Sequence, residues 1–251
     1  MCDSKTCMET TVPTRRAFLR QSGVSAFAAA LGGVMTASLA VGAQARTQTL
    51  PKPRNALSPD EAIQRLMEGN ARYVSGTTRR HDFAHEREAL SGGQNPYAAV
   101  LSCADSRIAP EYAFDSMRGD LFVTRVAGNF VNDDILGSLE YAIAVLKVPV
   151  VLVLGHDKCG AVDAAVKVAM KGATYPGKIQ SLATALLPAV NKVKDQSANL
   201  LDAAIAQNVR DSIANLRSQS EIIQGAAKSG KLKIIGGVYR LSTGKVARLE
   251  A

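Results

Sequence analysis

Residues 148–160, VPVVLVLGHDKCG, decide the fold of this chain. The stretch opens with an almost unbroken run of valine and leucine, which is typical of a β-strand buried on both faces of a parallel sheet. Pro149 lies near its start, where a strand tolerates a residue without a backbone N–H. His156 and Cys159 follow the run, and both are residue types that bind metals. The stretch therefore predicts a central strand that carries polar side chains to one edge of a sheet.

Two apolar runs precede this strand, and a helical pattern follows the second of them. Residues 98–101 and 121–126 are short and largely apolar, whereas residues 133–147 place apolar side chains at helical spacing. The same patterns predict helices over 58–73, 83–90, 161–171 and 199–228, and strands over 232–241 and 245–249. We therefore expect an α/β fold, a central mostly parallel β-sheet flanked by helices, in one domain that spans residues 58–251.

The first predicted helix has a clear start. Ser58 is a typical capping residue, Pro59 suits the first helical turn, and Glu61 completes a capping box. The preceding residues, 46–57, contain two prolines and are interpreted as a linker.

The N-terminal segment, residues 1–45, resembles a twin-arginine signal peptide. Arg15 and Arg16 precede an uncharged Ala- and Gly-rich run over residues 24–41, and residues 43–45 supply the small residues of a cleavage site. The resemblance implies export of a folded protein by the twin-arginine machinery to the periplasm, with no stable membrane insertion after cleavage. The alternative is a single membrane anchor, for which the apolar run is barely long enough.

Composition argues against a nucleic-acid partner. The formal net charge is +8, but the basic residues are scattered along the sequence rather than clustered. Aromatic residues make up 5% of the chain and tryptophan is absent, so stacking platforms for single strands are not expected.

Two cysteines remain outside the signal segment. Cys103 follows the strand predicted over residues 98–101, and Cys159 follows the strand that ends near His156. Carboxyl ends of parallel strands meet at one edge of the sheet, where ligands bind in α/β folds. The pair could form a disulfide, the default in an exported protein. With His156 the two cysteines could instead hold a zinc ion and leave one coordination position open, as in catalytic zinc sites.

An ordered set of motifs resembles the β-class carbonic anhydrases. Residues 103–107, CADSR, and 156–160, HDKCG, match the two signature motifs of that family. Residues 119–129 and 137–142 are similar to the family's second strand with its loop and to the next helix. The resemblance covers residues 58–164 and continues more loosely to the C-terminus.

The resemblance implies the site and its chemistry. Cys103, His156 and Cys159 match the ligands of one Zn²⁺ per chain, and Asp105 and Arg107 match a catalytic pair. The implied reaction is the reversible hydration of carbon dioxide to bicarbonate and a proton. Zinc-bound hydroxide attacks carbon dioxide, and the Asp–Arg pair orients this nucleophile.

Five further residues match the lining of the family's substrate pocket: Gln94, Phe122, Ala127, Tyr141 and Gly160. Gln94 is expected to donate a hydrogen bond to a substrate oxygen. Ala127 replaces a bulkier aliphatic residue of some members, and Gly160 is expected to permit close backbone approach beside the metal.

Some members of the family close the site at low pH. The residue that matches Asp105 then becomes the fourth zinc ligand, and a bicarbonate occupies a second site that uses a tryptophan three residues before the first cysteine. Val100 holds that position here, which favours an open site at rest. Two thiolate ligands cancel the charge of the ion, so we expect activity to rise toward alkaline pH.

The family also implies a homodimer or a multiple of dimers. The helix after Ser58 resembles the arm that embraces the neighbouring subunit; alternatively, it packs only on its own sheet. His81 and His85 lie outside the motifs, and we expect a surface role for them rather than proton transfer, for which Tyr141 or external buffer are the other candidates.

Two rival functions stay open. The same scaffold could act on carbonyl sulfide or carbon disulfide, although Gln94, Phe122 and Tyr141 favour carbon dioxide. A non-catalytic zinc or thiol-redox protein would need a Cys103–Cys159 disulfide and would not need the Asp–Arg pair.

Overall fold

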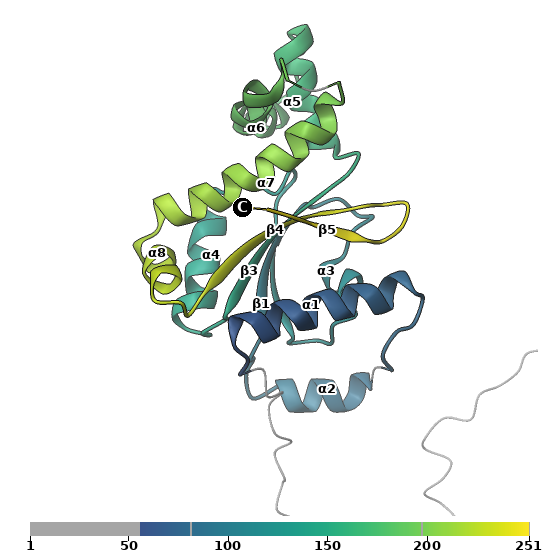
Figure 1. Ribbon diagram of the computed structural model, residues 1–251, viewed down its shortest axis with the longest axis vertical. Coiled ribbons are helices and arrows are strands. Elements are labelled where there is room, and N and C mark those ends of the chain that lie inside the picture. The colour runs from purple at the N-terminus through teal and green to yellow at the C-terminus, as the bar shows by residue number, and fades with distance from the viewer. Residues whose placement is uncertain (1–55, 81, 197, 251) are drawn as a thin grey trace, which may run out of the picture. The chain divides into compact units, whose positions relative to one another are not determined.

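Five strands form the central sheet of the computed structural model, which describes residues 56–80, 82–196 and 198–250 (Figure 1). The strands are β1 (Ala98–Ser102), β2 (Leu121–Arg125), β3 (Val150–His156), β4 (Lys233–Tyr239) and β5 (Val246–Leu249). Their order is β2-β1-β3-β4-β5, with all pairs parallel except the antiparallel pair β4–β5. The expectation of a mostly parallel sheet is confirmed.

The strand β3 is central, and every one of its residues is buried. It begins at Val150 rather than at 148, because Pro149 has no N–H to give to the sheet. It ends at His156, so the histidine belongs to the strand itself. The parallel neighbours β1 and β4 therefore flank the strand that carries His156.

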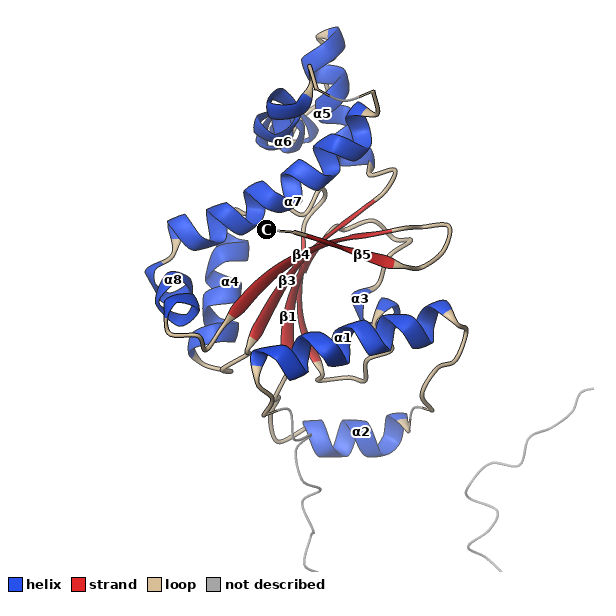
Figure 2. Cartoon of the chain, viewed as in Figure 1, coloured by secondary structure: helices blue, strands red, loops and turns tan. Residues whose placement is uncertain are grey.

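Eight helices lie among the described residues (Figure 2). They are α1 (Pro59–Val74), α2 (Phe83–Leu90), α3 (Pro110–Ala113), α4 (Asp133–Ala144), α5 (Gly160–Lys171), α6 (Ile179–Val193), α7 (Leu200–Gln219) and α8 (Glu221–Lys228). The sequence analysis did not predict α3 or α6. It also predicted one helix over 199–228, which is wrong: Ser220 has an extended backbone, and its hydroxyl accepts from Ile223 N at 3.1 Å to start α8.

Alternate residues along the strands face opposite layers of helices. Val100 and Leu152 pack in a cluster with α1 and α3, whereas Leu101 and Val153 pack in a second cluster with α4, α7 and α8. The helix α4 ends at Ala144, shorter than predicted, and Lys147 adopts a left-handed backbone with φ +59°. Helices thus cover both faces of the sheet, as its two-sided burial requires.

The helix α1 begins as predicted. Ser58 N donates to Glu61 Oε2 at 2.8 Å, and Glu61 N donates back to Ser58 Oγ at 3.4 Å, which completes the capping box. Ala62 and Leu66 of α1 are fully buried in the cluster on its own sheet. Within this chain α1 therefore packs on its own sheet, and its contact with a second subunit stays a prediction.

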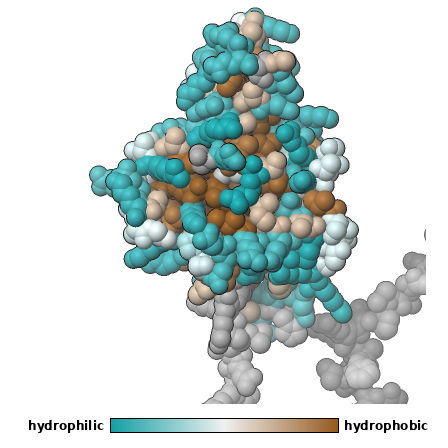
Figure 3. Space-filling model, in the orientation of Figure 1, coloured by the Kyte–Doolittle hydropathy of each residue, from teal (hydrophilic) through white to brown (hydrophobic). Residues whose placement is uncertain are grey.

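On the face shown in Figure 3, hydrophobic side chains gather over the sheet between α7 and α1, with hydrophilic side chains around them. Among the described residues no helix is long and apolar enough to cross a membrane. The predicted signal peptide, residues 1–45, and nearly all of the linker lie outside the described residues.

Candidate metal centre

The carboxyl ends of β1 and β3 bring three metal-binding side chains together. Cys103 directly follows β1, His156 ends β3, and Cys159 precedes α5. The two strands are adjacent and parallel, with Ser102 opposite Leu154. The ligand atoms of the three side chains lie within 4.8 Å of one another, and all three residues are buried.

The geometry of the sulfur atoms fits a tetrahedral ion. Cys103 Sγ and Cys159 Sγ are 3.9 Å apart and both cysteines are free. Two thiolates on one tetrahedral zinc at the usual bond length of about 2.3 Å would lie about 3.8 Å apart. A disulfide would need about 2.05 Å. The separation therefore matches a shared metal and not the disulfide of the redox alternative.

The imidazole of His156 is also arranged for a metal. Its Nδ1 lies 2.8 Å from the carbonyl oxygen of Asp157, which assigns the ring proton to Nδ1. Its Nε2 is buried and has no hydrogen-bond partner among the described residues. A buried acceptor without a partner is costly unless something binds it, and a metal ion fits this position.

The ionisation of the two thiols favours the binding of a cation between them. The hydrogen bond from Cys159, together with the nearby imidazole of His156 and the hydrogen bond from Gly128 N at 3.2 Å, lowers the pKa of the Cys103 thiol although burial opposes this. The adjacent Cys103 thiolate and burial raise the pKa of Cys159. Burial disfavours a charge on His156, but the neighbouring Cys103 thiolate raises its pKa. A divalent cation would allow both sulfurs to ionise.

Asp105 and Arg107 form a two-point ion pair beside the sulfurs. Arg107 donates from Nε to Asp105 Oδ1 at 2.9 Å and from Nη2 to Oδ2 at 2.6 Å. These hydrogen bonds hold the pKa of Asp105 well below its usual value, although partial burial opposes them. Asp105 Oδ2 lies 3.8 Å from His156 Nε2, so the carboxylate stands at the edge of the metal site.

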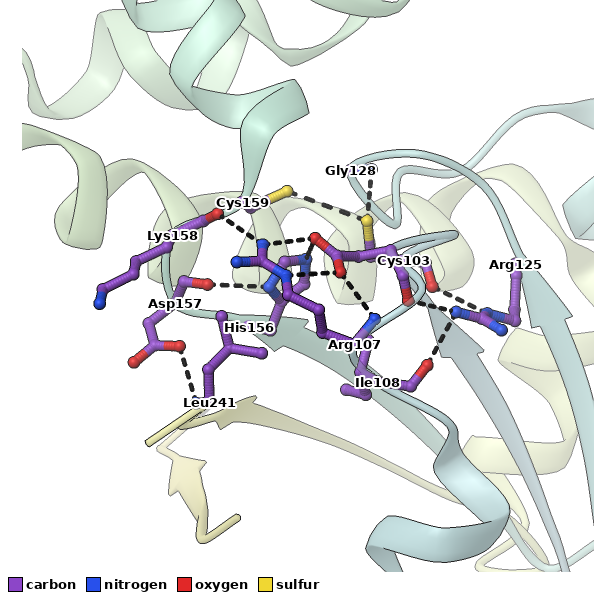
Figure 4. A network of polar contacts seen from close by, with 11 residues as sticks. Cys103, Arg107, Ile108, Arg125, Gly128, His156, Asp157, Lys158, Cys159 and Leu241 are labelled. Carbon is purple, nitrogen blue, oxygen red and sulfur yellow. Dashed lines mark hydrogen bonds and ion pairs between the residues drawn. The ribbon is translucent and has the colours of Figure 1, made fainter. Parts of the chain in front are cut away.

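Arg107 also joins the two loops that carry the ligands. Its Nη2 donates to the carbonyl of Lys158 at 3.2 Å, and the Lys158 backbone is left-handed with φ +52° (Figure 4). Asp157 Oδ1 accepts from Leu241 N at 2.9 Å, which ties the second loop to the chain after β4. Both loops are therefore fixed by hydrogen bonds within one chain.

A second arginine, not singled out from the sequence, holds the first loop. Arg125 ends β2 and donates to the carbonyls of Cys103 at 2.8 Å, Asp105 at 2.7 Å and Ile108 at 2.8 Å (Figure 4). A lone arginine at the end of a predicted strand gives little signal in one sequence. Its role depends on β1 and β2 being neighbours.

The residues expected to line the substrate pocket are more open than the metal site. Phe122 and Tyr141 lie near each other, with ring centroids 6.3 Å apart, and Tyr141 is 47% exposed. Ala127 is half-buried and Gln94 is exposed, in the segment between α2 and β1. Gly160 is the first residue of α5, and a Cβ there would meet nothing within 4 Å. No other part of this chain therefore requires glycine at this position, and the close approach expected beside the metal stays a prediction.

His81 and the side chain of His85 lie outside the described residues, so the expectation for them stays a prediction. Val100 is fully buried in β1.

The sequence of the chain matches known carbonic anhydrases. A family model described as carbonic anhydrase matches residues 98–246. The carbonic anhydrase of Mycolicibacterium smegmatis is 37% identical over 190 residues, which cover 75% of this chain and 92% of the relative. Carbonic anhydrase 2 of Mycobacterium tuberculosis is 36% identical over 189 residues, which cover 75% of this chain and 91% of the relative.

Solved structures extend the match to the fold. The β-carbonic anhydrase CcaA aligns with a TM-score of 0.61 and 28% identity, over 76% of this chain and 88% of that one. The Coccomyxa β-carbonic anhydrase, solved in complex with acetazolamide, gives a TM-score of 0.56 and 27% identity, over 76% and 82%. The strand order, the Cys–His–Cys group and these matches together show that the chain belongs to the β-class carbonic anhydrases.

Proposed function

We propose that this chain catalyses the reversible hydration of carbon dioxide to bicarbonate and a proton with one Zn²⁺ held by Cys103, His156 and Cys159. The observation that carries the proposal is the convergence of these three buried ligand atoms at the ends of adjacent strands. Three protein ligands leave one position of a tetrahedral ion for chemistry. Zinc supplies the Lewis acidity that turns a water into a nucleophile near neutral pH.

Asp105 orients that nucleophile. Its carboxylate, kept ionised by Arg107, accepts a hydrogen bond from the attacking O–H group and directs a lone pair toward carbon dioxide. Arg107 cannot lose its proton in the working pH range, so the carboxylate stays an acceptor. Gln94 donates its amide N–H to a substrate oxygen.

The resting site is open in this proposal. The pairing of Asp105 with Arg107, rather than its insertion among the sulfurs, supports this arrangement. Ligation of the ion by Asp105 on acidification is the alternative state, and it requires that the two hydrogen bonds to Arg107 break.

A second copy of the chain completes the substrate pocket. The exposure of Gln94 and Tyr141 supports this, because a pocket for an apolar gas needs walls that exclude water. β-Carbonic anhydrases of Sordaria macrospora are described as tetrameric. For this chain we propose a homodimer or a multiple of dimers.

The chain acts after export through the twin-arginine pathway to the periplasm. Arg15, Arg16 and the uncharged run of residues 24–41 support this part of the proposal. Replacing both arginines by lysine should leave the protein in the cytoplasm, as measured by cell fractionation. Equal periplasmic amounts of both forms would contradict it.

The test of the activity is stopped-flow hydration of carbon dioxide by the purified mature chain at pH ~8.5, with zinc quantified in the same sample. The expected result is fast hydration with about one zinc per chain. Zinc without hydration, together with hydrolysis of carbonyl sulfide or carbon disulfide, would favour the rival substrates. Absence of both zinc and hydration would contradict the proposal.

A further inference from the structure

The helix α7 carries two polar residues on a stripe that is otherwise apolar. Asn208 and Ser212 are 4% and 1% exposed, and they alternate with buried Ile205, Val209 and Ile213 along the same face. A buried amide or hydroxyl is costly without a hydrogen-bond partner, so each needs a structural reason. Neither residue is part of the metal centre described above.

Both side chains bind the backbone of the loop that follows β2. Asn208 Nδ2 donates to the carbonyl of Gly128 at 2.7 Å, and Ser212 Oγ donates to the carbonyl of Asn129 at 3.2 Å. The N–H of Gly128 in turn donates to Cys103 Sγ at 3.2 Å. Two hydrogen bonds therefore link the amide of Asn208 to a metal ligand through one residue, Gly128.

The loop cannot easily take another shape. Gly128 has a φ of +84°, and a Cβ there would come within 2.6 Å of Leu186. The helix α7 also packs close to the sheet, because glycine occupies the facing strand positions Gly155 and Gly236. A Cβ at these positions would come within 2.9 Å and 2.8 Å, respectively, of Val209 in α7. Asn208 therefore lies on a helix that packs closely against the strand carrying His156.

We propose that Asn208 is a positioning residue for the metal centre, which fixes Gly128 so that its N–H is aimed at the sulfur of Cys103. This inference rests on the proposed function, in which that sulfur binds zinc. A hydrogen bond to a ligand sulfur orients it and reduces the negative charge that it gives to the ion. Loss of the Asn208 amide should weaken the metal site and change the character of the Cys103–metal bond.

The test compares four variants of the full mature chain. Asn208→Ala removes the amide, and Asn208→Asp keeps its size but replaces the donor with an acceptor. Ser212→Ala removes the second, longer hydrogen bond. Asn215→Ala is the matched control, because Asn215 lies two turns along α7 and, among the described residues, donates no hydrogen bond to the loop.

Two readouts are needed, both independent of turnover. Zinc affinity is measured by competition with a chelator, and the thiolate-to-metal charge-transfer band is recorded after cobalt substitution. Both Asn208 variants should bind zinc about tenfold more weakly than the Asn215→Ala control, at the low end of the effects of outer residues. Their cobalt band should also shift. Ser212→Ala should change both quantities in the same direction but less.

The inference is overturned if both Asn208 variants match the control in zinc affinity and in the cobalt band. It is also overturned if affinity falls while the band stays unchanged, because that pattern marks a general loss of stability. Should Asn208→Ala and Asn208→Asp fail to fold, Ser212→Ala decides by the same two readouts. Failure of the unsubstituted chain to bind zinc at all would instead reject the proposed function.

Discussion

The two halves of the proposed active site differ in how complete they are within one chain. In the metal half, Cys103, His156 and Cys159 are at most 3% exposed and their loops are held by hydrogen bonds from Arg107 and Arg125. In the substrate half, Tyr141 is 47% exposed, and Gln94 lies open on the surface.

This difference shows which interactions each half needs. Metal ligands must be placed to within tenths of an ångström, and the ends of two adjacent strands provide that placement. A pocket for a small apolar substrate needs only surfaces that exclude water, and a second copy of the chain can supply them. Variants in the two halves should therefore fail in different ways.

The largest effect is expected in the metal half. His156→Ala removes the one imidazole ligand and leaves the two thiols facing an incomplete site. Zinc content should fall far below one per chain, and hydration should fall by at least about 100-fold, more than outer residues cause. Metal analysis and stopped-flow hydration on one sample measure both. Full zinc content in this variant would exclude His156 as a ligand.

Asp105→Asn should separate nucleophile orientation from metal binding. The amide keeps the size of the carboxylate but loses its charge and the two-point ion pair with Arg107. We expect kcat/KM for hydration to fall about 100-fold while zinc content stays near one per chain. Ser106→Ala is a suitable control, because Ser106 is the neighbouring residue and no role is assigned to it. An unchanged rate would remove Asp105 from the mechanism.

The pH profile tests the charge of the metal half. Two thiolates leave the bound ion less able to acidify a water than three neutral imidazoles would, so activity should rise several-fold from pH ~7 to pH ~9. Asp105 does not cause this rise: Arg107 lowers its pKa, so it is already ionised throughout this range. Stopped-flow rates in matched buffers measure the profile. A flat profile from pH ~6 to pH ~9 would contradict this account of the charges.

Among the three substitutions, the smallest effect is expected in the substrate half. The ring centroids of Tyr141 and Phe122 lie 6.3 Å apart. Tyr141→Ala removes one of these two rings but leaves the proposed zinc ligands in place. We expect a reduction in kcat/KM of about tenfold or less, with zinc content unchanged. Sedimentation of the same sample shows whether a weaker dimer accompanies the loss. Loss of zinc would mean that the two halves are not independent.

Much of the fold could be predicted because the strongest patterns are local. Each of these patterns depends on a few neighbouring residues. They are the apolar run before His156, the helical spacing over 133–147 and the capping box at Ser58. The failures also have local causes. Pro188 lies inside α6, and an internal proline argues against a helix, so α6 was not predicted. Ser220 separates α7 from α8, but the helical spacing of apolar residues continues across it and does not mark the break.

The convergence of Cys103, His156 and Cys159 was predictable because motifs at the ends of parallel strands must meet at one edge of the sheet. The residues that hold the loops were not, because they act across distant parts of the sequence. Arg125 can reach the carbonyls of Cys103 and Ile108 only because β1 and β2 are paired in the sheet. Asn208 left a signal that could have been used: a polar residue on the apolar stripe of a helix, with Ser212 one turn later.

X-ray absorption at the zinc edge tests the ligand set most directly. The account predicts two sulfurs at about 2.3 Å, one imidazole nitrogen at about 2.0–2.1 Å, and one further light atom that does not come from the chain. The spectrum should therefore be the same for Asp105→Asn. A site with fewer than two sulfurs, or a first coordination shell that changes in Asp105→Asn, would contradict an open centre formed by Cys103, His156 and Cys159.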